Sequence, residues 1–190
     1  AFKGEGLRLG HIMKLRSCTL EEFRSCITND PADKFAKTFV AKANMQKQWE
    51  YCIGAWEGDE LLGAIITTIS KREPKVANLQ LLHTFNKHRG KGVGRILTDQ
   101  SLSYAIENKA LYFRVSAEPD AVAFYEKCGF FFWGKQKSGA SLSIFKIGGS
   151  TYSEGVYYNK DPIIRKALYS GRKGSLASSY KNPEQNQLLT

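Results

Sequence analysis

The chain has 190 residues, of which 42% are hydrophobic and 24% are charged, and it carries a formal net charge of +10 at pH 7. This length suits one domain with an apolar core and is short for two. No window approaches the roughly 18 apolar residues that a membrane-spanning helix needs, so we expect no membrane segment and no membrane partner.

The positive charge would attract anions such as coenzyme A, nucleic acid or an acidic protein, and it does not choose among them. The first residues lack the apolar stretch of a secretory signal, which predicts a cytoplasmic protein. The cysteines stand at wide, irregular spacings without a Cys-x-x-Cys pair, so we expect reduced, mostly buried thiols and no metal site. They are Cys18, Cys26, Cys52 and Cys128.

One strand and two helices are predicted first. Residues Leu7 to Lys14 have the pattern of a strand, and Thr19 followed by Glu22 forms the capping-box pattern that starts a helix. Asp30-Pro31 is typical of a second helix start. The second helix would bury apolar residues that recur at three- and four-residue intervals. These are Phe35, Phe39, Val40 and Ala43.

A β-hairpin is predicted next. The runs from Trp49 to Trp56 and from Leu61 to Ile69 are rich in β-branched and aromatic residues, and Glu57 to Glu60 has turn chemistry. Gly63, inside the second run, indicates a bulge or a close approach of another backbone.

After the hairpin, strands and helices alternate. A strand runs into a glycine-rich turn and a long helix, and a short strand, a helix opened by Pro119 and a closing hairpin follow. The pattern predicts a mixed α/β sheet flanked by helices. The bounds are Val76 to Phe85, the turn Arg89 to Gly94, the helix carrying Ile96, Leu97, Leu102 and Ile106, the strand Leu111 to Ala117, the helix ending near Cys128-Gly129, and the hairpin Phe130 to Gln136 with Leu142 to Ile147.

A domain boundary is predicted after Ile147, where the composition changes to Gly148-Gly149-Ser150 and then to a basic, tyrosine-bearing segment. We expect residues 1–147 to form one domain. Residues 148–190 would form an extension that is partly disordered or packs on the partner subunit of a homodimer.

The most informative segment is the turn Arg89-Gly90-Lys91-Gly92-Val93-Gly94-Arg95. Its glycines let backbone N–H groups converge on an anion at the positive end of the following helix, and the natural ligand of such a site is a pyrophosphate. Three cationic side chains add to the attraction, and no acidic residue lies between Leu79 and Ile96. The alternative is a solvated turn that binds nothing.

Two familiar glycine loops do not fit this segment. A nucleoside-triphosphate loop needs Ser or Thr after its Gly-Lys pair, and Gly92-Val93 stands there instead. A dinucleotide-binding turn belongs to the first βαβ unit and needs an acid about 20 positions later, and Tyr112 to Arg114 offers none.

The turn from Arg89 to Gly94 resembles the signature of the GNAT acetyltransferase superfamily, which is Arg or Gln, two residues, Gly, one residue, then Gly or Ala. A second similarity lies at Ala121, Phe124-Tyr125-Glu126-Lys127 and Gly129-Phe130. Two motifs in the family's order are more specific than either alone. The resemblance implies a mostly antiparallel, twisted sheet with a central, splayed pair of parallel strands and flanking helices.

The resemblance also implies an acetyl-coenzyme A-dependent N-acetyltransferase. In this family the pyrophosphate of the cofactor lies on the backbone amides of the turn, and the pantetheine arm lies beside the preceding strand. Carried onto this sequence, the cofactor-binding residues are Leu82, His83, Thr84, Arg89, Gly90, Lys91, Gly92, Val93, Gly94 and Arg95.

Acetyl transfer from a thioester to an amine needs an unprotonated nucleophile, a donor to the developing oxyanion and a proton for the departing thiolate. By resemblance, Tyr125 supplies that proton. The alternative is that Tyr125 only packs within an amphipathic helix. A backbone N–H in the strand from Leu82 to Thr84 would bind the oxyanion.

The sequence identifies no general base. Family members often place Glu or His on the strand before the turn, but the comparable positions here are Asn78 and Gln80, which cannot accept a proton. Strand alternation predicts that His83 faces the other way. The amine would then lose its proton to water, or to a group from a segment that the sequence does not place.

The expected acceptor is an amine of a small molecule or peptide, bound over the segments from Thr19 to Gln48 and from Lys135 to Ser143. One alternative is a nucleic acid acceptor, a base or transfer RNA, which the net charge and the basic extension favour. Another is a module that binds coenzyme A without catalysis, which the missing base favours.

Overall fold

The computed structural model describes residues 13–42, 49, 51–71, 75–135 and 141–146. The extension after residue 147 and the turn of the closing hairpin lie outside the described residues. In chain order the elements are β1 (Lys14–Ser17), α1 (Leu20–Cys26), η1 (Pro31–Asp33), α2 (Lys34–Val40), β2 (Tyr51–Glu57), β3 (Glu60–Ile69), β4 (Val76–Thr84), η2 (Asn86–His88), α4 (Val93–Glu107), β5 (Tyr112–Ala117), η3 (Pro119–Ala121), α5 (Val122–Lys127), β6 (Phe131–Lys135) and β7 (Ser141–Lys146).

Within the described ranges, seven strands form one sheet in the order β1-β2-β3-β4-β5-β7-β6. Every neighbouring pair is antiparallel except β4 and β5, which are parallel. A parallel pair needs a crossover, and α4 supplies it. The predicted mixed, mostly antiparallel sheet is therefore confirmed.

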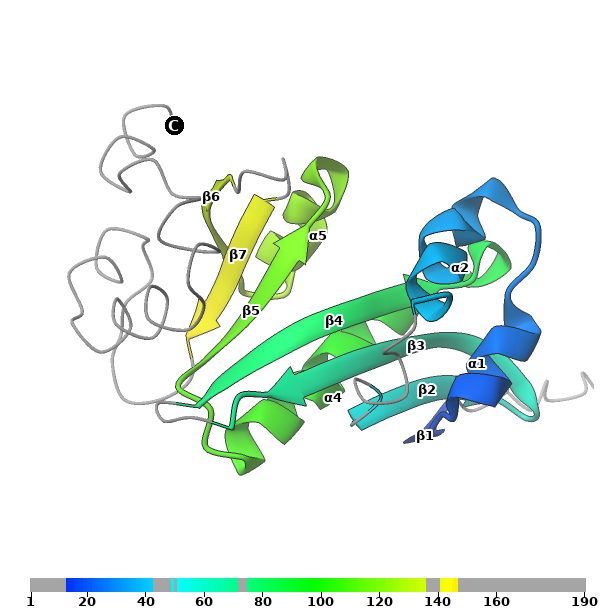
Figure 1. Ribbon diagram of the computed structural model, residues 1–190, viewed down its shortest axis with the longest axis horizontal. Coiled ribbons are helices and arrows are strands. Elements are labelled where there is room, and N and C mark those ends of the chain that lie inside the picture. The colour runs from blue at the N-terminus through cyan, green and yellow to red at the C-terminus, as the bar shows by residue number, and fades with distance from the viewer. Residues whose placement is uncertain (1–12, 43–48, 50, 72–74, 136–140, 147–190) are drawn as a thin grey trace, which may run out of the picture.

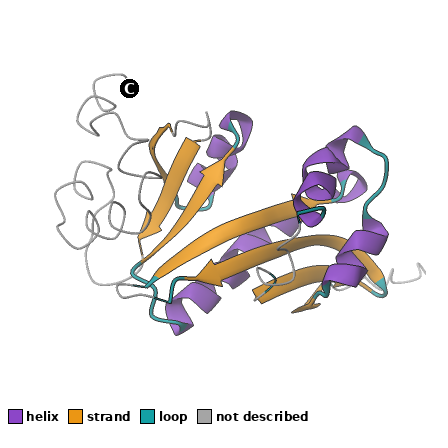
Figure 2. Ribbon diagram, viewed as in Figure 1, coloured by secondary structure: helices purple, strands orange, loops and turns teal. Residues whose placement is uncertain are grey.

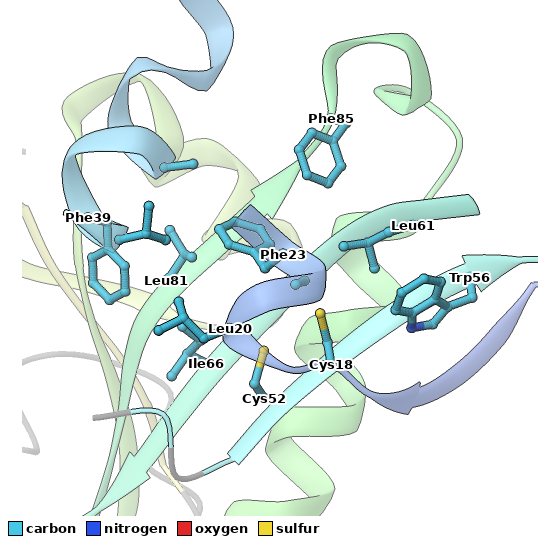
Figure 3. Packing of buried hydrophobic residues seen from close by; sticks show 13 residues of the cluster. Cys18, Leu20, Phe23, Phe39, Cys52, Trp56, Leu61, Ile66, Leu81 and Phe85 are labelled. Atoms are coloured by element: carbon cyan, nitrogen blue, oxygen red, sulfur yellow. The ribbon is translucent and has the colours of Figure 1, made fainter. Parts of the chain in front are cut away.

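Helices cover both faces of the sheet (Figure 2). Helices α1 and α2 pack on one face of β2, β3 and β4, which we call the front face, and Figure 3 shows the cluster that they bury there. Helices α4 and α5 pack on the back face. The alternation of side chains along each strand supplies apolar groups to both faces, so most of the central strands are buried.

The parallel strands diverge after a short paired stretch. Their register runs from Val76 opposite Tyr112 to Leu79 opposite Val115 and stops there. β4 continues to Thr84 against β3 alone. In Figure 1 the two strands lie side by side at one end and separate toward α2 and α5. The predicted splayed pair is confirmed, and beyond Leu79 no strand of the described residues pairs with that edge of β4.

The N-terminal elements follow the prediction in part. β1 covers residues 14–17, while most of the strand predicted over 7–14 lies outside the described residues. The capping box is confirmed, because Thr19 Oγ1 accepts a hydrogen bond from the Glu22 N–H at 3.1 Å and Glu22 Oε2 accepts one from the Thr19 N–H at 2.8 Å.

The predicted core stripe of α2 is wrong at Phe35, which is 54% exposed. A turn of 3-10 helix, η1, precedes α2, and the face turned to the sheet carries Ala36, Phe39 and Val40 instead. Phe35 lies against the Phe39 ring from the solvent side, with ring centroids 6.3 Å apart. Ala43 lies outside the described residues.

The early hairpin is confirmed in β2 and β3, and Gly63 has the close backbone contact that its position predicted. A Cβ atom at Gly63 would lie 2.6 Å from the His83 carbonyl oxygen and 3.1 Å from Thr84 Cα. Only glycine allows β3 and β4 to approach this closely at that point.

Candidate active site

The glycine-rich turn leads directly into α4. Gly92 is the N-cap of that helix in a left-handed conformation with φ of 79°, and Gly90 has φ of 77°. A Cβ atom at either position would meet no atom of the described residues within 4 Å, so these residues leave open space in front of the turn. The first N–H groups of a helix have no partner within the helix, and here they are available to an anion.

The third glycine has a packing role. A Cβ atom at Gly94 would lie 3.3 Å from the Phe124 ring of α5 and 3.6 Å from Thr84 Oγ1. Arg95 spans the same contact, because its Nη1 donates to the Lys127 carbonyl oxygen at 2.6 Å and its Nε lies 3.2 Å from Asp99. The start of α4 is therefore fixed against the end of α5.

The predicted cofactor residues form one continuous run around the open edge of β4. Leu82, His83 and Thr84 belong to the part of β4 that β5 does not pair, and the turn follows them. Arg89, Lys91 and Arg95 are exposed, while Val93, the first residue of α4, is buried against the back face of the sheet. Arg89 Nε donates to the Thr84 carbonyl oxygen at 3.3 Å, which ties the turn to the strand.

Tyr125 lies in the second motif and is 6% exposed. Its ring packs edge-on against Phe124 and Phe130, with centroids 5.1 Å and 5.5 Å away. Burial raises the pKa of the hydroxyl above its ordinary value. Tyr125 therefore carries its hydroxyl proton at neutral pH, as a proton donor must.

A β-bulge in β4 changes which side chains share a face. Leu79 is opposite Thr67 and Leu81 is opposite Ile66, so Gln80 is an extra residue in the strand. An extra residue reverses the alternation that follows it. Gln80 donates to Thr68 Oγ1 at 2.9 Å, and Asn78 is opposite the same Thr68.

The bulge overturns the prediction that His83 faces away from Asn78 and Gln80. Leu81, two residues before His83, packs in the front-face core with α1 and α2. The His83 ring contacts Phe23 of α1 edge-on with centroids 6.1 Å apart, so it lies on that same front face. Strand alternation without a bulge could not have placed it there.

His83 and Asp33 form a buried pair. His83 Nε2 lies 2.9 Å from Asp33 Oδ1, and the side chains are 5% and 3% exposed. Asp33 Oδ2 accepts hydrogen bonds from the N–H and the hydroxyl of Thr28, both at 2.8 Å. Burial acts to raise the pKa of Asp33, but these hydrogen bonds hold it below its ordinary value. Burial lowers the pKa of His83, although Asp33 opposes that shift.

A cavity of about 430 Å³ opens next to this pair. Asp33 and Phe85 line it, and both contact His83, Phe85 through an edge-on ring contact with centroids 5.0 Å apart. Asp30, Asp59 and Glu60 also line the cavity, with Lys87 as a cation. Acidic side chains therefore outnumber basic ones in the lining of this cavity, although the net charge of the protein is positive.

The described residues contain no group of three or more His, Cys, Asp or Glu side chains that could hold a metal ion. In the same parts of the chain, no helix has the length and apolarity to cross a membrane. The cysteines are free thiols, and three of the four are buried.

The profile of the acetyltransferase (GNAT) domain matches residues 15–146. This match covers most of the chain, including both motifs and the splayed strands. The chain belongs to the GNAT family, which consists of acetyl-coenzyme A-dependent N-acetyltransferases. No curated protein sequence matches it.

Solved structures with the same fold have low sequence identity to the chain. The PaiA N-acetyltransferase from Thermoplasma acidophilum, in complex with coenzyme A, has a TM-score of 0.58 at 15% identity, over 72% of this chain and 99% of its own. Ard1 from Thermoplasma volcanium has a TM-score of 0.56 at 18% identity, with the same coverage. A GNAT family acetyltransferase from Brucella melitensis, in complex with acetyl-coenzyme A, has a TM-score of 0.52 at 16% identity, over 75% of this chain and 92% of its own.

Sequence reasoning missed the pair of His83 and Asp33. The two residues are 50 positions apart, and Asp33 lies in a short 3-10 turn that was predicted as helix. Gln80 gives no sequence signal of a bulge. The single available signal was Asp30-Pro31, which places an acidic turn at the start of the second helix.

Proposed function

We propose that the protein transfers the acetyl group of acetyl-coenzyme A to a primary amine of a small molecule or peptide. One observation carries the proposal: the unpaired edge of β4 runs straight into a helix N-terminus that is open to solvent. An extended thioester with a pyrophosphate at one end fits such an edge and such a terminus. Coenzyme A and acetyl-coenzyme A in the structures of similar fold support this assignment.

The pyrophosphate would bind the amides of residues 89–95, and Lys91 would add charge. The pantetheine arm would extend beside Leu82 to Thr84 and complete the edge of β4 with its own amides. A β4 N–H would then face the thioester carbonyl oxygen and stabilise the oxyanion.

The chemistry then needs three proton movements. The acceptor loses one proton to become a free amine, and its nitrogen forms a bond to the acetyl carbon. The C–S bond breaks as Tyr125 gives its hydroxyl proton to the thiolate sulfur, and the proton that the nitrogen loses at this stage restores Tyr125. Each turnover releases one proton, the amide and the free thiol of coenzyme A.

The test combines binding with turnover. Acetyl-coenzyme A should raise the melting temperature, because a ligand that binds only the native state stabilises it by mass action. Thiol release should then be measured with a small aliphatic amine, an amino acid amide and a short peptide with a free N-terminus. An unchanged melting temperature at millimolar coenzyme A would contradict the proposal.

A further inference from the structure

The front face of β4 contains one group that is suited to accept a proton. Asn78 and Gln80 are amides and cannot do so. The bulge at Gln80 places His83 on their side of the sheet, where helices α1 and α2 pack. The face on which Asn78 and Gln80 offer no base therefore carries an imidazole further along β4.

The hydrogen bond to Asp33 fixes the tautomer of that imidazole. Two hydrogen bonds from Thr28 stabilise the Asp33 carboxylate, and a carboxylate can only accept. Nε2 of His83 must therefore carry the hydrogen that points to Asp33 Oδ1. Nδ1 is left with a lone pair, which is the group a general base needs.

We infer that His83, held by Asp33, is the general base that takes the first proton from the acceptor amine. The inference rests on the proposed function and assigns the residue that its first proton movement lacks. The N–H bond of the ammonium breaks and an Nδ1–H bond forms, directly or through one water molecule. The imidazolium that results is stabilised by Asp33 and later returns the proton to solvent.

The surroundings of His83 fit this role. Asp33 faces it from η1, the rings of Phe23 and Phe85 enclose it, and Arg89 opposes protonation from the turn. The lowered pKa keeps the imidazole neutral at pH 7 and ready to accept. The carboxylates of the cavity that Asp33 and Phe85 line would attract a cationic amine to the Asp33 side of the pair.

The first experiment compares His83→Gln with the wild type at saturating acetyl-coenzyme A and varied pH, with an amine that the wild type acetylates. In the wild type, kcat/KM for the acceptor should fall as the pH drops through the pKa of His83. That pKa lies below the ordinary value for histidine, because the side chain is buried. In His83→Gln, kcat/KM for the acceptor should be about 100-fold lower than in the wild type at neutral pH. This fall of kcat/KM at low pH, the acid limb of the profile, should be absent from the variant. Its kcat/KM should recover as the pH approaches the pKa of the acceptor amine. Its affinity for coenzyme A should stay that of the wild type, because the proposed contacts of residues 82–84 with the pantetheine arm are made by the main chain.

His88→Gln is the matched control. His88 is equally buried and its Nε2 lies 3.1 Å from a carboxylate oxygen of Glu60, but it belongs to η2 rather than to the front face of β4. This variant should keep the acid limb. A wild-type pH profile in a folded His83→Gln variant would overturn the inference and leave the proposed function intact.

Asp33→Asn gives a second test if His83→Gln fails to fold. Removing the carboxylate removes the group that raises the His83 pKa, so the acid limb should move to lower pH, while a purely structural role would leave it unmoved. An unmoved limb, or a limb moved to higher pH, contradicts the inference. The chain has three histidines, so the nitrogen resonances of labelled imidazoles can report the Nε2–H tautomer directly. Absence of wild-type turnover with every amine would remove the proposed function, and the base assignment with it.

Discussion

The two ends of the proposed site are built in different ways. The cofactor end uses glycines, backbone amides and one strand edge within residues 82–95. The acceptor end uses a side-chain pair between Asp33 and His83, from segments far apart in the chain. Main-chain recognition leaves a compact sequence motif, because the backbone geometry needs particular glycines at fixed spacings. A pair of side chains from distant segments, such as Asp33 and His83, produces no motif in the sequence, because no fixed spacing relates the two residues.

Replacing Tyr125 should give the largest change, and it tests the end that the sequence predicts. Tyr125→Phe removes only the hydroxyl from an aromatic cluster, so the protein should fold and bind coenzyme A normally. Loss of a general acid should lower kcat by about 100-fold or more. Steady-state kinetics measures kcat, and a calorimetric titration measures the affinity for coenzyme A. Wild-type turnover would reduce Tyr125 to a packing residue.

Gly92→Asp should weaken cofactor binding and leave the pair of Asp33 and His83 unchanged. It places a side chain and a negative charge in the open space before α4, at a left-handed residue. Affinity for coenzyme A should fall on the order of 100-fold. Gly92→Ala is the control, since it brings the same backbone strain without the charge and should weaken binding less. Equal affinities for the aspartate and alanine variants would mean that the phosphates bind elsewhere.

Gly63→Ala affects both ends at once. Its Cβ would press on the His83 carbonyl and on Thr84, which are backbone atoms that cannot move aside cheaply. We expect a loss of about 1–3 kcal/mol in the free energy of unfolding, measured by chemical denaturation. Gly58→Ala, in the β2–β3 turn, meets no neighbour but has φ of 59°, so it should lose only about 1 kcal/mol. A Gly63→Ala variant as stable as the wild type would mean that β3 and β4 can separate.

Removal of the chain after Gly149 should have the smallest effect. The removed segment carries six Lys and Arg against three Asp and Glu, a modest part of the net charge. Cofactor binding and turnover of small amines should stay within about two-fold, because every proposed contact lies before it. Acetylation confined to oligonucleotides, and lost with this segment, would instead support a nucleic acid acceptor. The solution mass of both proteins would reveal a homodimer.

The sequence predicted the fold where local chemistry decides it. The Thr19 capping box, the turn from Glu57 to Glu60 and a helix that follows the glycine-rich turn each depend on neighbours within a few residues. Phe35 was misplaced because the buried face of α2 is centred on Ala36, Phe39 and Val40, which leaves Phe35 at the edge of that face. The spacing of apolar residues alone does not show where such a face is centred. His83 was assigned to the wrong face because Gln80 forms a bulge, which depends on its pairing with β3 and not on its own identity.

The splayed strands should also give β4 an alternating pattern of amide hydrogen exchange rates. Beyond Leu79, successive amides alternate between bonding to β3 and pointing into the gap left by β5. Without cofactor, amide protons should therefore exchange slowly and quickly by turns along a single strand. A ligand that completes the edge would slow the fast set and leave the slow set unchanged. The last amide that becomes protected would then show how far along β4 the pantetheine extends.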